Sequence, residues 1–327
     1  MAEENKSVES GCDPSSCATC PSASNCGSAK PAFDPANKAS NIKHVIAVMS
    51  GKGGVGKSFV SASLAVDLKS KGYNVGILDA DITGPSIPKM FGVKNNITGT
   101  DDGIIPGETA MGIRVMSVNL LLEHDDDPVV WRGPVIAGVI KQFWGEVVWG
   151  DLDYLIIDMP PGTGDVPLTV FQSIPVDGTI IVTSPQDLVK MIVGKSVNMA
   201  KKMDIPILGV VENYSYLECP DCGKHIPVFG ESKIDEIAKE LGIDVLGKMP
   251  IMTKSASLAD KGAFDLSENK YIDDATKVLE NLDKQCYNEY NAGSIQSAAC
   301  IFFDKKIFFN FFVMFFHLAC LYDKRAR

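Results

Sequence analysis

The sequence predicts an α/β protein: a doubly wound, mostly parallel sheet with helices on both faces, preceded by a flexible arm rich in cysteine. Short strand-forming runs alternate with longer helical stretches from residue 41 to about 285, the order that crossover connections produce. Most strand candidates are continuous Val, Ile and Leu runs, as expected for a sheet covered on both faces. A glycine-rich loop between the first strand and the first helix is a third observation in favour of this fold.

The individual elements follow from these patterns in chain order. Strands are expected at 44–50, 74–81, 113–118, 154–158, 178–184, 207–213 and, from a less apolar run, 244–250. Helical stretches are expected between them, among them 58–71, 134–149, 187–203 and 231–241. Composition divides the chain into a polar, Cys-rich arm over 1–40, an α/β domain over 41–285 and a Phe-rich extension over 286–327, to which the sequence assigns no role.

The charge and the N-terminus narrow the class of protein. Acidic residues outnumber basic ones by 41 to 31, and the net charge is −10. Binding to nucleic acid without regard to sequence needs a basic face, so we expect no nucleic-acid partner. The N-terminus is polar and acidic and lacks the apolar stretch of a secretory signal, so we expect a cytoplasmic protein. Its nine cysteines then need an explanation other than disulfides.

The C-terminal extension contains an apolar, Phe-rich run at 307–322, flanked by basic residues. This run is shorter than the roughly 20 residues that a membrane-spanning helix needs. We therefore expect no membrane partner, unless the tail itself supplies a membrane contact. The alternatives to a membrane contact are that the hydrophobic tail docks on the protein or that the extension is unrelated to the main function.

The glycine-rich loop satisfies the phosphate-binding pattern G-x-x-x-x-G-K-[ST]. Its glycines allow successive backbone N–H groups to form an anion nest, to which the following helix adds its positive end. Lys57 should contact the β- and γ-phosphates of ATP, and Ser58 should offer its hydroxyl to Mg²⁺. We therefore expect a P-loop NTPase whose nucleotide-binding loop is Gly51, Lys52, Gly53, Gly54, Val55, Gly56, Lys57 and Ser58.

Acidic residues end two of the expected strands, where a doubly wound sheet places its ligand site. Asp79 and Asp81 end one strand, and residues two apart in an extended chain face the same side, so both carboxylates are expected to point toward the nucleotide. Asp158 ends another apolar strand, as expected of an acid that holds Mg²⁺ directly or through water. Gly162 can bring a backbone N–H close to a γ-phosphate. The alternative for the acids is helix capping.

A second lysine in the same loop, Lys52, needs its own explanation. The spacing K-G-G-x-G-K-[ST] resembles the deviant Walker A motif of the family that includes MinD, ParA and the nitrogenase iron protein. In that family the first lysine reaches across a dimer to the nucleotide of the partner. The alternative is a solvated surface lysine.

Two cysteines, Cys219 and Cys222, form a C-x-x-C just after the strand that ends near Asn213. A tetrahedral zinc ion or an iron–sulfur cluster usually takes four protein ligands, so this pair is incomplete by itself. A zinc half-site, for which His225 could be a third ligand, and a redox pair are two interpretations. A third is that a two-fold dimer supplies a second pair, so that four thiolates bridge one [4Fe–4S] cluster.

The N-terminal arm contains a second group of cysteines. Four soft ligands within so short a polar segment are enough for one [4Fe–4S] cluster from a single chain. Zinc, bound in a knob or by a mobile metal-scavenging arm, is the alternative, because thiolate sites accept it readily. The expected ligands are Cys12, Cys17, Cys20 and Cys26.

Taken together, these residues resemble the Mrp/ApbC group of iron–sulfur cluster carrier ATPases, which includes eukaryotic cytosolic nucleotide-binding scaffold proteins. The resemblance runs from about residue 41 to 285 and depends on GKGGVGKS (51–58), DADITGPSIP (79–88), WRGP (131–134), DMPPGTGD (158–165) and VENYSYLECPDCG (211–223). The arm resembles the four-cysteine arm of some members, although its first gap has only four residues here.

The resemblance implies a slow, dimeric ATPase that holds a labile [4Fe–4S] cluster and passes it to apo iron–sulfur proteins. It also implies that Asp81 positions the hydrolytic water, that Asn213 contacts the adenine, and that Cys219 and Cys222 bridge the dimer. Two alternatives remain: a MinD- or ParA-like positioning ATPase, and an electron-transfer ATPase like the nitrogenase iron protein. The C-x-x-C argues against the first, and the ligands of the second lie elsewhere in its chain.

Overall fold

The computed structural model describes residues 33–82, 84, 86–94, 97–122, 131, 133–186 and 189–291. The chain divides into two units, Met1–Phe33 and Asp34–Arg327, and every described residue except Phe33 belongs to the second. The four arm cysteines Cys12, Cys17, Cys20 and Cys26 and the Phe-rich run lie outside the described residues. Within the described part, no helix has both the length and the apolar character needed to cross a bilayer.

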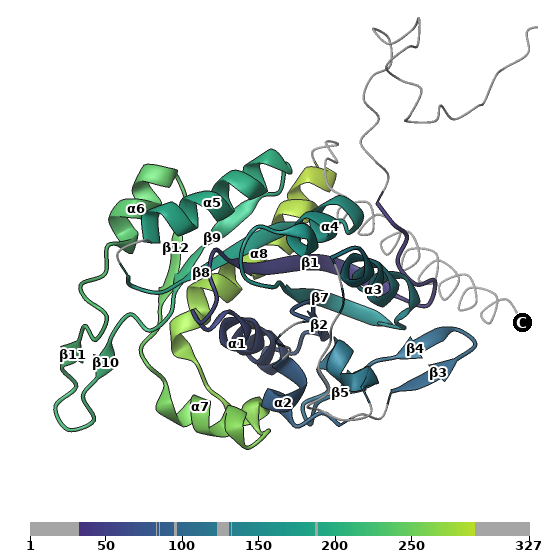
Figure 1. Cartoon of the computed structure of the whole chain (residues 1–327), viewed down its shortest axis with the longest axis horizontal. Coiled ribbons are helices and arrows are strands. Elements are labelled where there is room, and N and C mark those ends of the chain that lie inside the picture. Colours follow the sequence, from purple (N-terminus) through teal and green to yellow (C-terminus); the bar gives the residue numbers. More distant parts are fainter. Residues whose placement is uncertain are drawn as a thin grey trace, which may run out of the picture. The chain divides into compact units, whose positions relative to one another are not determined.

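Eight strands form one sheet in the order β12-β9-β8-β1-β7-β2-β6-β5 (Figure 1). All neighbours are parallel except β5 and β6. The strands β2, β6 and β5 lie to one side of β1 and β7, and β8, β9 and β12 lie to the other. Their bounds are β1 Asn41–Ser50, β2 Val75–Asp79, β5 Gly107–Glu108, β6 Arg114–Ser117, β7 Asp151–Asp158, β8 Gly178–Thr183, β9 Ile207–Glu212 and β12 Val245–Lys248.

Helices cover both faces of this sheet, and each face has its own hydrophobic layer. One layer receives side chains of α1 (Lys57–Ser70), α2 (Ile87–Phe91) and α8 (Asp273–Asn291). The other receives α3 (Gly133–Glu146), α4 (Asp165–Ser173), α5 (Val189–Lys202) and α6 (Ile234–Leu241). Because both faces are covered, the central strands are apolar on both sides, and the expected doubly wound α/β fold is confirmed.

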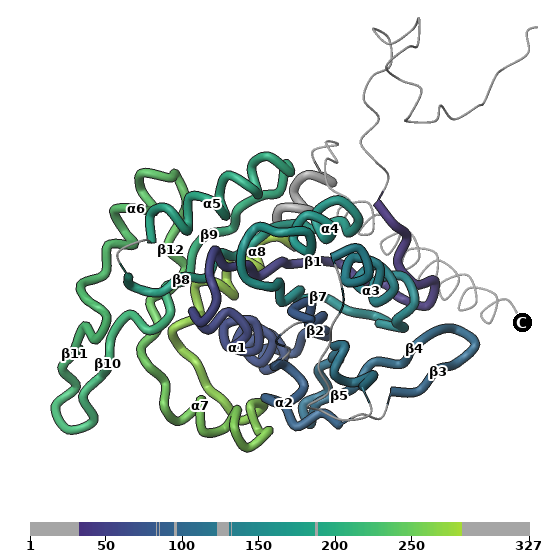
Figure 2. The backbone as a smooth tube through the Cα atoms, viewed as in Figure 1, coloured from purple at the N-terminus to yellow at the C-terminus, as the bar shows by residue number. Residues whose placement is uncertain are grey.

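Smaller elements complete the domain. Two short hairpins, β3 (Thr98–Thr100) with β4 (Gly103–Ile105) and β10 (Leu217–Glu218) with β11 (His225–Ile226), lie outside the main sheet. The β10–β11 hairpin extends outward on the side where β9 and β12 lie (Figure 2). Helix α7 (Thr253–Asp260) and 3₁₀ turns at Val118–Leu121, Phe264–Leu266 and Lys270–Ile272 connect the remaining segments.

Candidate nucleotide site and cysteine hairpin

The glycine-rich loop lies at the carboxyl end of β1 and leads into α1, as its motif requires. Gly54 and Gly56 have positive φ angles of 77° and 76°, which a residue with a side chain rarely adopts. A cavity of about 380 Å³ opens over this loop. Its lining includes the loop itself and residues from four later segments: Asp81, Ser86, Met90, Pro161, Tyr214, Ala256, Ala259 and Asp260.

Asp158 is the buried centre of a polar cluster below the loop. The Lys57 ammonium lies 2.8 Å from Asp158 Oδ1, and both side chains are buried. Ser58 Oγ donates a hydrogen bond to Asp158 Oδ2 at 2.6 Å, and Ser61 Oγ donates to Asp158 Oδ1 at 2.6 Å. Sequence reasoning missed Ser61, although it lies three residues after Ser58 on α1, a spacing that places two side chains on one helix face.

The cluster has the donor chemistry of a magnesium site. A hydroxyl and a carboxylate are the hard oxygen ligands that Mg²⁺ takes beside the phosphates of a nucleotide. Ser58 and Asp158 are within hydrogen-bond distance of each other, so one small cation could contact both. Lys57 lies on the same carboxylate and would turn toward phosphate oxygens as these arrive.

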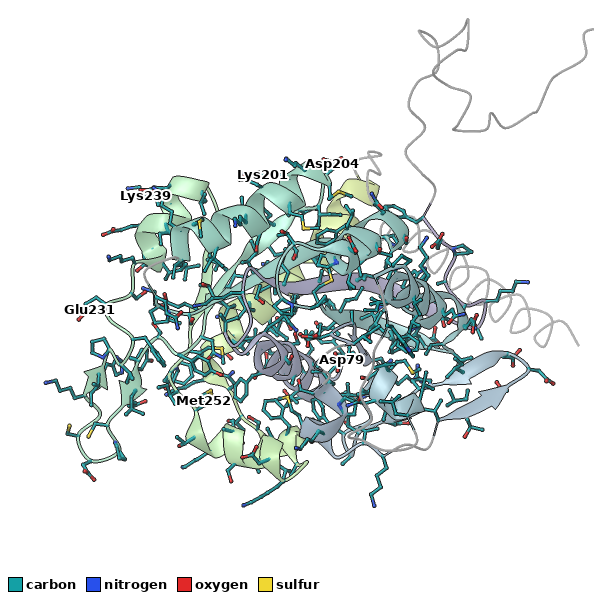
Figure 3. The ribbon with its side chains drawn as sticks, in the orientation of Figure 1. Asp79, Lys201, Asp204, Glu231, Lys239 and Met252 are labelled. Carbon is teal, nitrogen blue, oxygen red and sulfur yellow. The ribbon has the colours of Figure 1, made fainter. Side chains whose placement is uncertain are left out.

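The two acids that follow β2 have different environments. Asp81 lines the cavity, and its Oδ2 lies 4.0 Å from the Lys57 ammonium. Asp79 is completely buried among the side chains of the sheet (Figure 3), where it accepts hydrogen bonds from the Ile87 and Asp81 amides. The strand ends at Asp79, so the alternation expected for an extended chain does not continue to Asp81. Of the two carboxylates, the structure therefore places only Asp81 at the cavity.

Burial raises the pKa of Asp79 to about 8, and the Asp158 carboxylate contributes further in the same direction. These two acids are aligned in register on the neighbouring strands β2 and β7, so their side chains share a face of the sheet. The Lys57 ammonium and the Ile87 amide partly offset the rise in pKa. Burial therefore favours the protonated form of Asp79.

Two further loop residues that sequence reasoning assigned to the nucleotide have partners within the chain. The Gly162 amide, at a φ of 92°, donates to the Ser50 carbonyl oxygen at 2.7 Å, so a phosphate contact would require this hydrogen bond to open. Lys52 lines the cavity, and its ammonium donates to the side-chain oxygen of Gln186. Gln186 was not singled out from the sequence.

Asn213 holds the phosphate-binding loop through a hydrogen bond to its backbone. Its side chain is buried, and its Nδ2 donates to the Val55 carbonyl oxygen at 3.1 Å. Tyr214, the next residue, lines the cavity and was missed by sequence reasoning, although it lies in the VENYSYLECPDCG segment. The adenine contact of Asn213 stays a prediction, and in the structure the side chain holds the loop.

Cys219 and Cys222 lie on the turn of the β10–β11 hairpin, with Cys222 exposed and Cys219 half-buried, and neither forms a disulfide. The hairpin is closed by Cys219 N–H on the Lys224 carbonyl oxygen and Gly223 N–H on the Cys219 carbonyl oxygen. The backbone N–H of Cys222, and then that of Asp221, lower the pKa of the Cys219 thiol. Amides that point at sulfur favour the thiolate, the form that binds metal.

His225, considered above as a third ligand, instead stacks on the Tyr216 ring with 3.9 Å between centroids. Among the described residues, no group of three or more His, Cys, Asp or Glu side chains could hold a metal ion. The hairpin therefore offers two thiol ligands, as the C-x-x-C pattern indicates.

A phosphate-binding loop at the carboxyl edge of a parallel sheet, with a buried lysine–aspartate pair and a serine hydroxyl beside it, defines a P-loop NTPase. The chain belongs to the family of NUBPL iron-transfer P-loop NTPases of the ParA class, whose family model matches residues 41–286. The family resemblance inferred from the motifs is thereby confirmed.

Relatives with curated names agree with this assignment. An iron–sulfur cluster carrier protein of Methanocaldococcus jannaschii is 49% identical over 254 residues, covering 75% of this chain and 87% of the relative. One of Clostridium perfringens is 48% identical over 252 residues, covering 72% and 88%.

Solved structures share the fold. A nucleotide-binding protein from Archaeoglobus fulgidus, solved in complex with ADP, superposes with a TM-score of 0.64 at 45% identity, covering 70% of this chain and 90% of that one. MinD in a MinC–MinD complex from Aquifex aeolicus gives a TM-score of 0.52 at 20% identity, covering 73% and 96%. At that identity the likeness to MinD shows the fold alone.

Proposed function

We propose that this protein is an ATP-hydrolysing carrier that holds a [4Fe–4S] cluster at Cys219 and Cys222 and passes it to apo iron–sulfur proteins. The observation that carries the proposal is a pair of thiols, one exposed and one half-buried, on a hairpin that begins three residues after Tyr214, which lines the nucleotide cavity. Support comes from relatives that are named iron–sulfur cluster carrier proteins and align over most of their length. The cluster is cargo, so an exposed and incomplete ligand set suits its release.

At the nucleotide cavity, Lys57 binds the β- and γ-phosphates, and Ser58 with Asp158 holds Mg²⁺, which neutralises phosphate charge. Asp81, the carboxylate at the cavity, positions the hydrolytic water. Hydrolysis is slow without a partner, as in other switch-type NTPases, and is linked to cluster loading or transfer.

Two copies of the chain complete both sites. Two hairpins related by a two-fold axis supply the four thiolates that one cluster needs. Lys52 reaches the nucleotide of the partner subunit, leaving the Gln186 contact that it makes within its own chain. The arm cysteines Cys12, Cys17, Cys20 and Cys26 hold a separate cluster, and the protein acts in the cytoplasm without a nucleic-acid partner.

Iron analysis tests the carrier function. After anaerobic reconstitution of the full chain, the double variant Cys219→Ser/Cys222→Ser should lose one [4Fe–4S] cluster per dimer, which is about four iron and four sulfide. The cluster needs about four protein ligands, and the variant has none of the hairpin thiols. It should also lose the cluster-dependent gain in dimer affinity measured by sedimentation, since a bridging ligand stabilises the dimer that it selects. The variant should still bind ADP, because neither cysteine belongs to either hydrophobic layer of the domain.

The matched control is Cys286→Ser, which removes a cysteine that belongs to neither group. It should keep the full iron content. If the double variant keeps its full iron content and dimerises as the wild type does, the shared cluster is wrong, and Cys219 and Cys222 have a zinc-binding or structural role instead. A stable cluster that is reduced reversibly, followed by EPR, would favour electron transfer over carriage.

A further inference from the structure

The nucleotide cavity and the cysteine hairpin are joined by a very short segment of chain. Strand β9 ends at Glu212 and β10 begins at Leu217, so residues 213–216 alone separate the sheet from the hairpin. Asn213 holds the P-loop through the Val55 carbonyl oxygen. The residue between this anchor and the hairpin root is Tyr214.

One end of the Tyr214 side chain lies on the phosphate-binding loop. Tyr214 lines the cavity, and a Cβ added to Gly56 would lie 2.9 Å from its hydroxyl oxygen. The backbone of Tyr214 has a φ of 59°, a left-handed conformation that bulky residues rarely adopt. The structure around Tyr214 therefore fixes its orientation against that preference.

The ring of Tyr214 also contacts the segment that follows the hairpin. Its centroid lies 6.5 Å from that of Phe229, and the two rings are tilted by 52°. Phe229 follows β11, three residues after Ile226, and its side chain is 48% exposed. This ring pair is a side-chain contact between the cavity residue Tyr214 and the segment after β11.

The root of the hairpin is fixed to the body of the domain. Ser215 N–H donates to the Met249 carbonyl oxygen and Ile251 N–H donates to the Tyr216 carbonyl oxygen, both at 2.8 Å. Ser215 Oγ donates to the buried Glu212 carboxylate at 2.6 Å. These hydrogen bonds hold the backbone on the C-terminal side of Tyr214, so its side chain is the part of this residue that can respond to a ligand in the cavity.

We propose that Tyr214 is a positioning residue that couples the nucleotide cavity to the cysteine hairpin. A nucleotide that fills the cavity confines the Tyr214 ring, which in turn holds Phe229 and orders the segment that carries Cys219 and Cys222. The significance of this coupling for cluster transfer rests on the proposed function, but the coupling itself is a property of the chain without a cluster.

Hydrogen exchange of the cluster-free full chain tests the coupling. Saturating Mg-ADP should slow exchange of the Cys219 and Gly223 amides, which close the hairpin, by about fivefold or more, the lower end of usual coupling between sites. Tyr214→Phe removes the hydroxyl at the loop, and Phe229→Ala removes the ring contact at the exposed end. Each should reduce the effect to less than about twofold, and the double variant should be no worse than either single variant.

The control is Tyr73→Phe, which loses a hydroxyl that contacts Glu280, on the helix α8, instead of either site. It should keep the full protection, and ADP affinity measured for every variant ensures saturation. The coupling is disproved if ADP does not protect the wild-type hairpin, or if both variants keep the protection. A chain that shows the coupling but takes up no iron would contradict the proposed function alone.

Discussion

At the scale of single residues, the two buried acids at the carboxyl edge of the sheet have different hydrogen-bond and ion-pair partners. Asp158 accepts hydrogen bonds from two serine hydroxyls and pairs with the Lys57 ammonium, so its negative charge is compensated. Asp79 is as deeply buried, but it accepts hydrogen bonds from two backbone amides and from the Ser117 hydroxyl, the latter at 3.3 Å. Burial without a cation of its own therefore favours the protonated acid.

The raised pKa of Asp79 predicts a pH dependence of stability. The folded chain keeps this proton up to about pH 8, whereas the unfolded chain releases it near the ordinary value of 3.8. Between these values the folded state binds more protons, so this group's contribution to stability is largest below the unfolded pKa and is lost as the pH rises through the folded pKa, by up to about 1.4 kcal/mol per pH unit. Asp79→Asn should remove this slope.

Urea unfolding between pH 5 and 8 measures the effect. The free energy of unfolding should fall more steeply with pH in the wild type than in Asp79→Asn. Asp101→Asn, at an exposed turn, should follow the wild type. Identical profiles for the wild type and Asp79→Asn would show that Asp79 is ionised in the folded chain.

At the scale of elements, the phosphate-binding loop needs glycine at different positions for different reasons. Gly54 and Gly56 share a positive φ near 77°, so a side chain at either position is strained. A Cβ at Gly54 would meet nothing within 4 Å, whereas one at Gly56 would lie 2.2 Å from Asn213 Nδ2. Gly56 therefore also allows the close packing of the loop against the segment after β9.

This pair of glycines gives a matched prediction. Gly54→Ala should cost about 1–2 kcal/mol of unfolding free energy through backbone strain alone. Gly56→Ala should cost about 1–3 kcal/mol more, because Asn213 must move and lose its hydrogen bond to Val55. Urea unfolding without nucleotide compares the two, and equal losses would contradict the packing role of Gly56.

At the scale of the whole molecule, the fold places both candidate sites after the carboxyl ends of parallel strands, the phosphate-binding loop after β1 and the cysteine hairpin after β9. The hairpin provides two thiols, and Lys52 contacts Gln186 of its own chain while lining the cavity. Under the proposed function a second copy supplies the missing thiols and the missing lysine. Nucleotide and cluster then favour the same dimer, and their effects on each other's affinity must be equal.

Mixed dimers test whether Lys52 acts on the partner's nucleotide. Lys52→Ala and Asp81→Asn should each bind ATP but hydrolyse it at least about 100-fold more slowly, because each lacks a group that acts on the transition state. In a mixed dimer, one of the two composite sites has both groups intact. An equal mixture, in which about half of the dimers are mixed, should recover about a quarter of the wild-type rate.

The control replaces a lysine far from the cavity, Lys201→Ala at the exposed end of α5, and should leave hydrolysis unchanged (Figure 3). Absence of recovery in dimers shown to be mixed would mean that Lys52 acts within its own chain.

Most strands of the sheet follow from the sequence alone, because they are apolar runs whose burial on both faces leaves little choice of structure. The predicted strand at 178–184 is β8, Gly178–Thr183, and the predicted helix at 58–71 is α1, Lys57–Ser70, each within one residue at either end. The phosphate-binding loop was also predictable, since its glycines and lysine must occur at fixed spacing. The short hairpin that carries the cysteines has no such periodicity and was not predicted.

Which of the predicted side chains meet in the cavity depends on the tertiary structure. Local spacing gave Asp79 and Asp81 the same direction, but the strand ends between them and burial separates them. Asn213 and Gly162 donate hydrogen bonds to the carbonyl oxygens of Val55 and Ser50, respectively. The position of Tyr214 depends on a left-handed backbone conformation that its residue type does not predict. Such contacts join segments more than a hundred residues apart, so they depend on how the strands are ordered in the sheet, which local patterns do not encode.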